Sequence, residues 1–263
     1  MITSTSSSQV RHVISLLGKA RERKKYKEYV VEGVRMVSEI PSEMLVKAYI
    51  SEKFADSNPG FVKDFIRNKC IEKSAIELVS DHIFNRMSDT RTPQGIMAVV
   101  RMREYSLEDL MGENPLIIGM ENIQDPGNMG TILRMGEAAG ATGVMISSNS
   151  VDIYNPKTIR STMGSLYRVP FIVVEDFQQG IMELKNKRVK VYAAHLDGRN
   201  CYTEEDYTGA TAFIIGNEGN GITEKTASEC DTFIKIPMEG QVESLNAAIA
   251  CTILSFEAAR QRR

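Results

Sequence analysis

The chain has 263 residues, which is enough for one large domain or two of ordinary size. Hydrophobic residues make up 42% and charged residues 25%, as in globular proteins, and no apolar run approaches the roughly 18–20 residues that cross a bilayer. The formal net charge of −2, taken alone, argues against binding to nucleic acid. The missing apolar run excludes a membrane-spanning protein, and the charge excludes a uniformly basic one.

The first hundred residues alternate helical and strand-like segments. Val10, Val13 and Leu17 recur at helical spacing and predict a first helix with Ser8 as its N-cap. Further along, the pattern predicts strands at 29–31, 48–51 and 95–100, and helices at 34–40, 59–68 and 75–87. We therefore expect a compact α/β domain over residues 1–104.

A basic run lies within this domain. Its members crowd into nine residues with Glu22 as the only opposing acid: Lys19, Arg21, Arg23, Lys24, Lys25 and Lys27. Residues 1–110 hold 18 Lys and Arg against 15 Asp and Glu, whereas residues 111–263 hold 14 against 19. The run is either a solvated helix end or a set of contacts to a phosphate backbone.

A polar stretch over 101–114 marks the domain boundary, and a second domain is predicted over 112–263. Short apolar runs occur at 116–120, 143–146, 171–174, 189–194, 212–215 and 233–236, with helix-like segments between most of them. Near-continuous apolar strands that alternate with helices predict a parallel sheet covered on both faces. In the last helix, one apolar face is formed by Leu245, Ala248, Ile249, Ile253 and Phe256.

Three loops of this second domain follow strands and have unusual compositions. In α/β sheets, ligands gather at the carboxyl ends of strands. The first loop, 121–130, leads into a helix for which Asn128 is a predicted N-cap, and Arg134 follows six residues later. By itself this pattern fits a capped helix with an exposed arginine equally well.

The other two loops follow the strands at 212–215 and 233–236. The first of them places Gly216, Gly219 and Gly221 in a G-x-x-G-x-G spacing that matches neither a dinucleotide loop nor a P-loop, so a tight structural turn is the simpler interpretation. In the other, Ser244 is a predicted cap of the final helix and Asn246 lies in its first turn.

Cysteine and histidine usage gives no metal site. Cys70, Cys201, Cys230 and Cys251 are scattered, form no C-x-x-C pair and do not combine with the three histidines in a zinc-ligand spacing. Scattered thiols predict a reducing compartment, and Met1–Ser8 has no apolar segment typical of a signal peptide. We therefore expect a cytoplasmic protein without a metal.

In order and spacing, the three loops together resemble the motifs of the SpoU (TrmH-type) branch of the SPOUT methyltransferases. The residues that carry the resemblance are Asp125-Pro126-x-Asn128-x-Gly130-x-x-x-Arg134, Gly216-x-Glu218-x-x-Gly221, and Ile236-Pro237-Met238 followed by Ser244-Leu245-Asn246-Ala247-Ala248. In the first domain, Val31-Glu32-Gly33-x-Arg35 and Ser88-Asp89-x-x-Thr92-Pro93-Gln94-Gly95 resemble a substrate-binding domain similar to ribosomal protein L30e.

The resemblance implies a fold class and an activity. It implies an α/β trefoil-knot catalytic domain with a parallel sheet, a homodimer, and transfer of a methyl group from S-adenosylmethionine to a ribose 2′-hydroxyl of RNA, with 23S rRNA as the expected substrate. The implied catalytic residues are Arg134, Asn128, Glu218, Ser244 and Asn246. The implied cofactor-binding residues are Gly216, Ile236, Met238 and Leu245.

Two other functions fit parts of the sequence. A non-catalytic RNA-binding or ribosome-assembly protein could keep the fold without turnover, although it has no chemical need for all five polar residues. A nucleotide-binding enzyme could use residues 216–221 as a phosphate loop, but the spacing is wrong and no lysine follows.

Overall fold

The computed structural model describes residues 1–69, 73–196, 198, 200–242 and 244–263, and Cys70 lies outside them. The chain forms two compact units. The first comprises residues 1–103 together with 154–167, and the second comprises residues 104–153 and 168–263.

The first unit is a four-stranded sheet in the order β1-β4-β2-β3. β1 and β2 are each antiparallel to β4, and β2 is parallel to β3. The strands are β1 (Glu28–Glu32), β2 (Leu45–Ser51), β3 (Ile76–Val79) and β4 (Ile96–Arg101). The helices are α1 (Ser8–Gly18), α2 (Ala20–Tyr26), α3 (Val34–Glu39), α4 (Glu52–Ser57), α5 (Pro59–Lys69), α6 (Asp81–Met87) and α8 (Pro156–Thr162).

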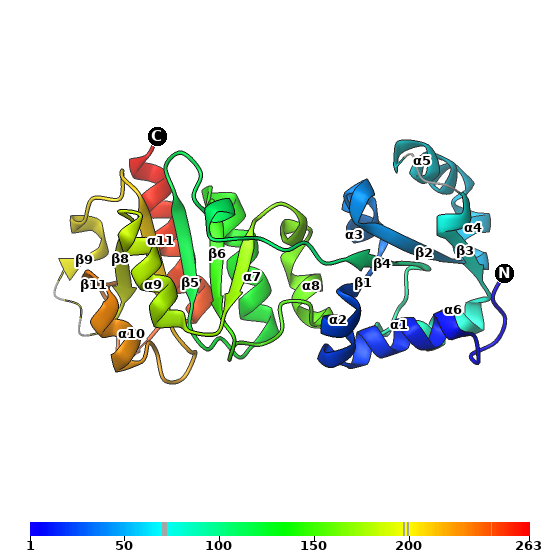
Figure 1. Ribbon diagram of the computed structural model, residues 1–263, viewed down its shortest axis with the longest axis horizontal. Helices are drawn as coiled ribbons and strands as arrows, with labels where there is room; N and C mark the ends of the chain where they lie inside the picture. The colour runs from blue at the N-terminus through cyan, green and yellow to red at the C-terminus, as the bar shows by residue number, and fades with distance from the viewer. Residues whose placement is uncertain (70–72, 197, 199, 243) are drawn as a thin grey trace. The chain divides into compact units, whose positions relative to one another are not determined.

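Helices cover both faces of this sheet, with α1 and α6 on one face and α3 and α5 on the other (Figure 1). Val10, Val13 and Leu16 of α1 are fully buried because their spacing places them on one side of the helix. They pack in one cluster with Phe84 of α6 and with sheet residues such as Met97. α1 begins at Ser8 as expected, but the N-cap position is Ser7 and not Ser8.

The helix predicted over residues 75–87 is wrong. The structure divides this segment into β3, which pairs in parallel with β2, and α6, which begins after Ser80. Ser80 is a good helix-start residue in the middle of the predicted helix. In the residues before Ser80, pairing of Ile76 and Val79 with β2 outweighs a weak helical propensity.

The second unit is a seven-stranded parallel sheet in the order β7-β6-β5-β10-β8-β11-β9. Six strands confirm the predicted runs: β5 (Leu116–Met120), β6 (Gly143–Ser147), β7 (Phe171–Val174), β8 (Lys190–Ala194), β10 (Thr211–Ile215) and β11 (Thr232–Lys235). The seventh, β9 (Asn200–Cys201), is too short to give a recognisable pattern.

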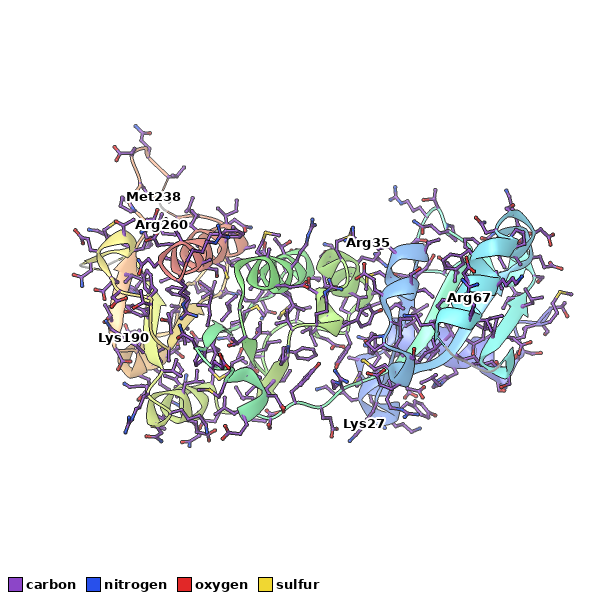
Figure 2. All side chains as sticks on the ribbon, turned by 90° about the horizontal axis from the view of Figure 1, so that it is seen from above. Lys27, Arg35, Arg67, Lys190, Met238 and Arg260 are labelled. Carbon is purple, nitrogen blue, oxygen red and sulfur yellow. The ribbon has the colours of Figure 1, made fainter. Side chains whose placement is uncertain are left out.

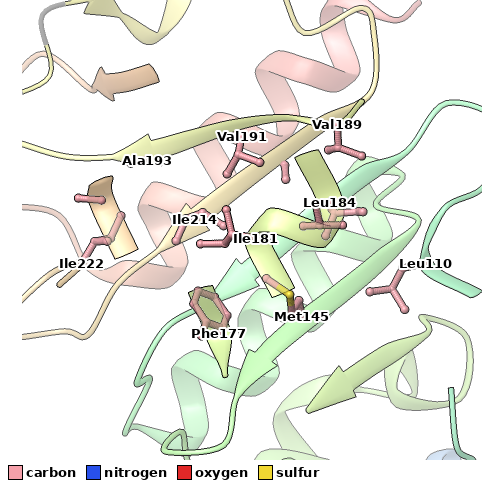
Figure 3. Close-up of a cluster of buried hydrophobic side chains, with 13 residues drawn as sticks. Leu110, Met145, Phe177, Ile181, Leu184, Val189, Val191, Ala193, Ile214 and Ile222 are labelled. Carbon is pink, nitrogen blue, oxygen red and sulfur yellow. The ribbon is translucent and has the colours of Figure 1, made fainter. Parts of the chain in front are cut away.

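Helices cover both faces of the parallel sheet, as predicted. The helices are α7 (Pro126–Ala139), α9 (Phe177–Asn186), α10 (Glu224–Glu229) and α11 (Ala247–Gln261). Alternate residues of β5 point to opposite faces: Ile117 joins the cluster formed with Phe177 and Ile181 of α9, whereas Ile118 lies against Gly136 of α7. Figure 3 shows the cluster on the α9 side, with Phe177 and Ile181 labelled. α11 packs alongside α7 and contacts β5 and β10.

The predicted apolar face of α11 is only partly the face that this chain buries: Ala248 is buried, and Leu245 and Ile253 are half-buried. Ile249 is 54% exposed and Phe256 is 41% exposed, while Cys251, Leu254 and Ala258 are fully buried. α11 contains small and apolar residues on nearly every side, so periodicity alone cannot decide which side faces the sheet. An apolar strip on α11 consequently remains at the surface of the single chain.

Candidate functional site

The three loops begin at the same edge of the parallel sheet. β5 and β10 are neighbours in register, with Met120 beside Ile215, so the first two loops leave the sheet side by side. The Glu121 amide donates to the Ile215 carbonyl at 2.9 Å, and Asn217 Nδ2 donates to the Asn122 carbonyl at 2.9 Å. The third loop follows β11, which is separated from β10 by β8.

In the first loop, the helix begins earlier than predicted. Asp125, and not Asn128, is the N-cap of α7, and its Oδ1 accepts a hydrogen bond from the Asn128 amide at 2.8 Å. Pro126 occupies the first helical position, where its fixed φ fits and its missing N–H costs nothing. The side chain of Asn128 is therefore not needed for capping and turns toward the other two loops.

The second loop is a turn that closes on itself. Asn217 and Gly221 exchange two backbone hydrogen bonds of 2.9 Å, and Asn217 Oδ1 accepts from the amides of Gly219 and Asn220 at 3.0 Å. A Cβ on Gly216 would lie 2.1 Å from the backbone of Gly221, so only glycine fits there. These amides are used within the turn, which agrees with the absence of a phosphate-loop spacing.

Glu218 projects from this turn and binds the first loop. Its Oε1 accepts from the Asp125 amide at 3.0 Å and from Asn128 Nδ2 at 2.9 Å, and its Oε2 accepts from the Gln124 amide at 3.1 Å. Burial acts to raise the pKa of Glu218, but the hydrogen bonds from Asn128, Asp125 and Gln124 outweigh it, and the pKa falls below 4.5. The carboxylate is therefore ionised at neutral pH.

The third loop reaches the same network through Asn246. Asn246, and not Ser244, is the N-cap of α11, with Oδ1 accepting from the amides of Ala248 at 2.9 Å and Ile249 at 3.3 Å. Its Nδ2 donates to Asn128 Oδ1 at 2.9 Å. Ser244 lies two residues before this cap, is exposed, and has no hydrogen bond to another described residue; its neighbour Glu243 lies outside the described residues.

Of the five polar residues expected in the site, the structure joins three. Glu218, Asn128 and Asn246 form one hydrogen-bonded chain across three loops that are up to 118 residues apart in sequence. Both ends of the Asn128 amide are engaged, the NH₂ group by a carboxylate and the oxygen by a donor, which fixes its orientation. The network holds the loops in one arrangement.

Arg134 does not belong to this network in the single chain. It lies on α7 about 9 Å along the helix axis from Asn128, as the rise of 1.5 Å per residue gives. Its side chain is exposed and forms no hydrogen bond or ion pair with any residue that the structure describes. The guanidinium is thus available to a group outside this chain.

The residues expected to bind a cofactor border the same sheet edge. Ile236, Met238 and Leu245 are half-buried, with Met238 on the projecting third loop (Figure 2). The described residues of 236–245 form no backbone–backbone hydrogen bond with another described residue. This loop therefore offers peptide donors and acceptors beside apolar side chains.

Sequence reasoning missed one buried carboxylate near the site. Glu121 is 3% exposed, and its carboxylate accepts from the Thr223 amide at 2.8 Å, from the Thr223 hydroxyl at 2.7 Å and from the Thr226 hydroxyl. These bonds tie the end of β5 to the start of α10, just after the Gly216–Gly221 turn. An acidic residue directly after an entirely buried strand is the sequence feature that could have identified it.

Within the described residues, no group of three or more His, Cys, Asp or Glu is placed to hold a metal ion. In the same part of the chain, none of the helices has the length and apolar character to cross a membrane. Burial raises the pKa of the Cys230 and Cys251 thiols to about 12, so neither is a nucleophile at neutral pH.

Comparison with protein families gives two matches that together cover most of the chain. The SpoU rRNA Methylase family matches residues 115–256, and the MRM3-like substrate binding domain matches residues 7–98. Among curated proteins, the chain is 33% identical over 239 residues to the 23S rRNA (guanosine(2553)-2′-O)-methyltransferase RlmP of Bacillus subtilis, covering 90% of each chain. It is 28% identical over 255 residues to the 23S rRNA (uridine(2479)-2′-O)-methyltransferase of Streptomyces viridochromogenes, covering 94% of this chain and 88% of the relative.

Solved structures give the same result over nearly the full length. The SpoU methyltransferase AviRb of Streptomyces viridochromogenes superposes with a TM-score of 0.86 at 26% identity, covering 97% of this chain and 98% of that one. An AdoMet-bound rRNA methyltransferase of Sinorhizobium meliloti superposes with a TM-score of 0.85 at 25% identity, covering 98% and 97%.

Proposed function

Because the chain belongs to the SpoU rRNA methylase family, we propose that it transfers the methyl group of S-adenosylmethionine to a ribose 2′-hydroxyl of 23S rRNA. The observation that carries this proposal is the chain of hydrogen bonds through Glu218, Asn128 and Asn246, which joins all three loops at one edge of the sheet. A site that orients two reactants can rely on such a rigid polar frame.

The cofactor is assigned to the second and third loops. Half-buried Ile236, Met238 and Leu245 would contact the adenine, and peptide groups of the described residues of the third loop would hydrogen-bond to it, with Gly216 at the start of the turn. When bound, S-adenosylmethionine supplies a methyl group on a sulfonium that is a good leaving group. The protein's residues therefore need to bind and orient the two reactants and to manage one proton.

Arg134 is assigned to the 2′-hydroxyl. An arginine side chain stays protonated in proteins, so it is a poor base unless a substrate phosphate assists it. Stabilisation of the forming alkoxide by the guanidinium is the simpler role. Asn128, Glu218, Ser244 and Asn246 would orient the ribose and the loops around it.

The enzyme is proposed to act as a homodimer. The exposed side of α11 carries Ile249 and Phe256, two large apolar side chains that water contacts in the single chain. A patch of this kind typically marks a protein interface. Arg134, exposed on neighbouring α7, would then meet a substrate held partly by the second subunit.

The division of labour follows the two domains predicted from the sequence. Residues 1–104 would bind RNA, as the match to an MRM3-like substrate binding domain over 7–98 supports, and residues 112–263 would carry the catalytic site. The expected rRNA substrate and the free thiols support a cytoplasmic location.

Mapping of 2′-O-methylated nucleotides in rRNA tests the proposal. A strain that lacks this protein should lose one modified position in 23S rRNA, and wild-type protein, but not the Arg134→Ala variant, should restore it. A non-catalytic assembly protein would leave the methylation map unchanged. Calorimetric titration with S-adenosylmethionine separates the two functions independently, because only the enzyme needs that cofactor.

A further inference from the structure

A cleft of about 730 Å³ opens in the first unit, outside the three loops. It lies between α1 and the beginnings of β1 and β2, and its lining includes Arg11, His12, Tyr26, Glu28, Lys47 and Tyr49. All of these residues belong to the first unit.

Aromatic rings form one side of the cleft. Tyr26 is 46% exposed, and its ring and the His12 ring form a T-shaped pair, with centroids 4.8 Å apart and an interplanar angle of 89°. Lys25 Nζ lies 4.8 Å from the centre of the same Tyr26 ring. The arrangement holds the Tyr26 ring in place while leaving much of it exposed to a planar ligand.

Polar groups of fixed orientation form another part of the lining, beside Val46 and Val99. His12 Nε2 and Glu28 Oε2 are 2.7 Å apart, and the Tyr49 hydroxyl donates to Gln9 Oε1 at 3.3 Å. Burial, followed by the nearby charges of Glu77 and Glu28, raises the pKa of Tyr49 to about 12, so its hydroxyl keeps its proton. The cleft thus offers both donors and acceptors of fixed orientation.

Positive charge lies next to Tyr26 on α2 and at its C-cap, beside the cleft lining and not within it. Lys24, Lys25 and Lys27 are exposed, with Lys27 at the surface in Figure 2, but Arg23 is not part of this surface. Arg23 is 4% exposed and its Nη1 donates to the Leu16 carbonyl at 2.6 Å, which ties α2 to the end of α1. The basic run therefore has a structural part and an exposed part.

We propose that this cleft binds one unstacked nucleotide of the RNA substrate, with its base against Tyr26 and its phosphates beside Lys24, Lys25 and Lys27. The inference rests on the proposed function, since it concerns the same RNA. Single-stranded RNA is recognised by stacking on aromatic rings, by hydrogen bonds to base edges and by basic side chains along the backbone. An exposed tyrosine, oriented polar groups and three lysines supply each of these. An apolar protein partner would have no use for the lysines.

The test compares Tyr26→Ala with Tyr26→Phe in the full-length protein. The probe is a 23S rRNA fragment that wild-type protein methylates, and its affinity is measured by fluorescence anisotropy. Loss of one stacked base should weaken binding by about 5- to 100-fold in the alanine variant, whereas the phenylalanine variant keeps the ring and most of the affinity. Calorimetry with S-adenosylmethionine and thermal unfolding should be unchanged in both, because the side chain is exposed and belongs to the first unit.

A charge comparison and a crosslink complete the test. Lys24→Glu should weaken RNA binding, and Lys63→Glu, the same change on exposed α5, should not. Fragments carrying 4-thiouridine at unpaired positions should crosslink to a peptide containing Tyr26. Equal RNA affinity of wild type and Tyr26→Ala, or crosslinks only elsewhere, would overturn the cleft assignment. If wild-type protein methylates no rRNA at all, the proposed function itself fails, which is a separate outcome.

Discussion

Replacement of Glu218 by glutamine should weaken both stability and catalysis, because Oε1 accepts from two donors and Oε2 accepts from the Gln124 amide and, at 3.5 Å, from Asn217 Nδ2. The amide oxygen of glutamine can still accept hydrogen bonds from Asp125 and Asn128. Its NH₂ group then faces the Gln124 amide, so two donors oppose each other and that hydrogen bond is lost. A hydrogen bond contributes about 0.5–1.5 kcal/mol and one to a charged group about 1.5–3. Because Glu218 is exposed, we expect a loss near the lower values, about 1–2 kcal/mol of unfolding free energy.

The catalytic loss should be larger than the loss of stability suggests. Asn128 is oriented by Glu218, so its displacement by a fraction of an ångström should lower kcat by about 10- to 100-fold. Glu113→Gln is the matched control, since it makes the same chemical change on an exposed side chain away from the loops. Urea unfolding and a single-turnover methylation assay measure the two effects. If Glu218→Gln behaves like Glu113→Gln in both assays, the network does not hold the site.

The same substitution predicts a pH dependence. The folded-state pKa of Glu218 lies below 4.5, so the stability it contributes is present above pH 4.5 and is lost as the pH falls through the folded-state pKa. The difference in unfolding free energy between wild type and Glu218→Gln should therefore shrink on acidification below pH 4.5. A difference that stays constant would mean that ionisation of Glu218 is irrelevant to the loop contacts.

Three further predictions concern Arg134, Asn246 and the exposed side of α11. Arg134→Ala should leave S-adenosylmethionine affinity unchanged in calorimetry and lower turnover by at least about 10²-fold, and Arg134→Lys should restore little, because a point charge cannot replace the planar fork. Normal turnover in the alanine variant would remove Arg134 from the site. Asn246→Ala should cost about 1 kcal/mol in urea unfolding through the lost N-cap, and Asn246→Asp should keep the cap but lose the donor to Asn128. An aspartate variant with full turnover would show that this donor is dispensable. Ile249→Glu should shift the protein from dimer to monomer in light scattering, and an unchanged mass would exclude this side of α11 from the interface.

Strand positions in the centre of the second unit were predictable because β5, β6 and β10 are buried on both faces. Leu116–Met120 and Thr211–Ile215 are entirely buried runs, and such runs between helices have few alternative interpretations. The common edge of the loops followed from the parallel arrangement. The prediction of one helix over residues 75–87 was wrong because β3 depends on its pairing with β2, and a local pattern does not contain that pairing.

The contacts of the site could not be predicted from local pattern. Glu218 and Asn128 are 90 residues apart, and their hydrogen bond exists because β5 and β10 are neighbours in the sheet. The start of α7 could have been predicted correctly, since Asp125-Pro126 is a better helix start than the predicted Asn128. The buried side of α11 was not, because Ile249 and Cys251 are both apolar and only packing distinguishes them.

The most direct test of the central claim is methyl transfer by the purified protein. Wild-type protein is incubated with S-adenosylmethionine carrying a labelled methyl group and with 23S rRNA that lacks modifications, and the RNA is digested to nucleosides. We expect the label in a single 2′-O-methylated nucleoside, and we expect Arg134→Ala to incorporate at least about 10²-fold less. Label in a base-methylated nucleoside, or no incorporation by wild-type protein that binds both the cofactor and the RNA, would contradict it.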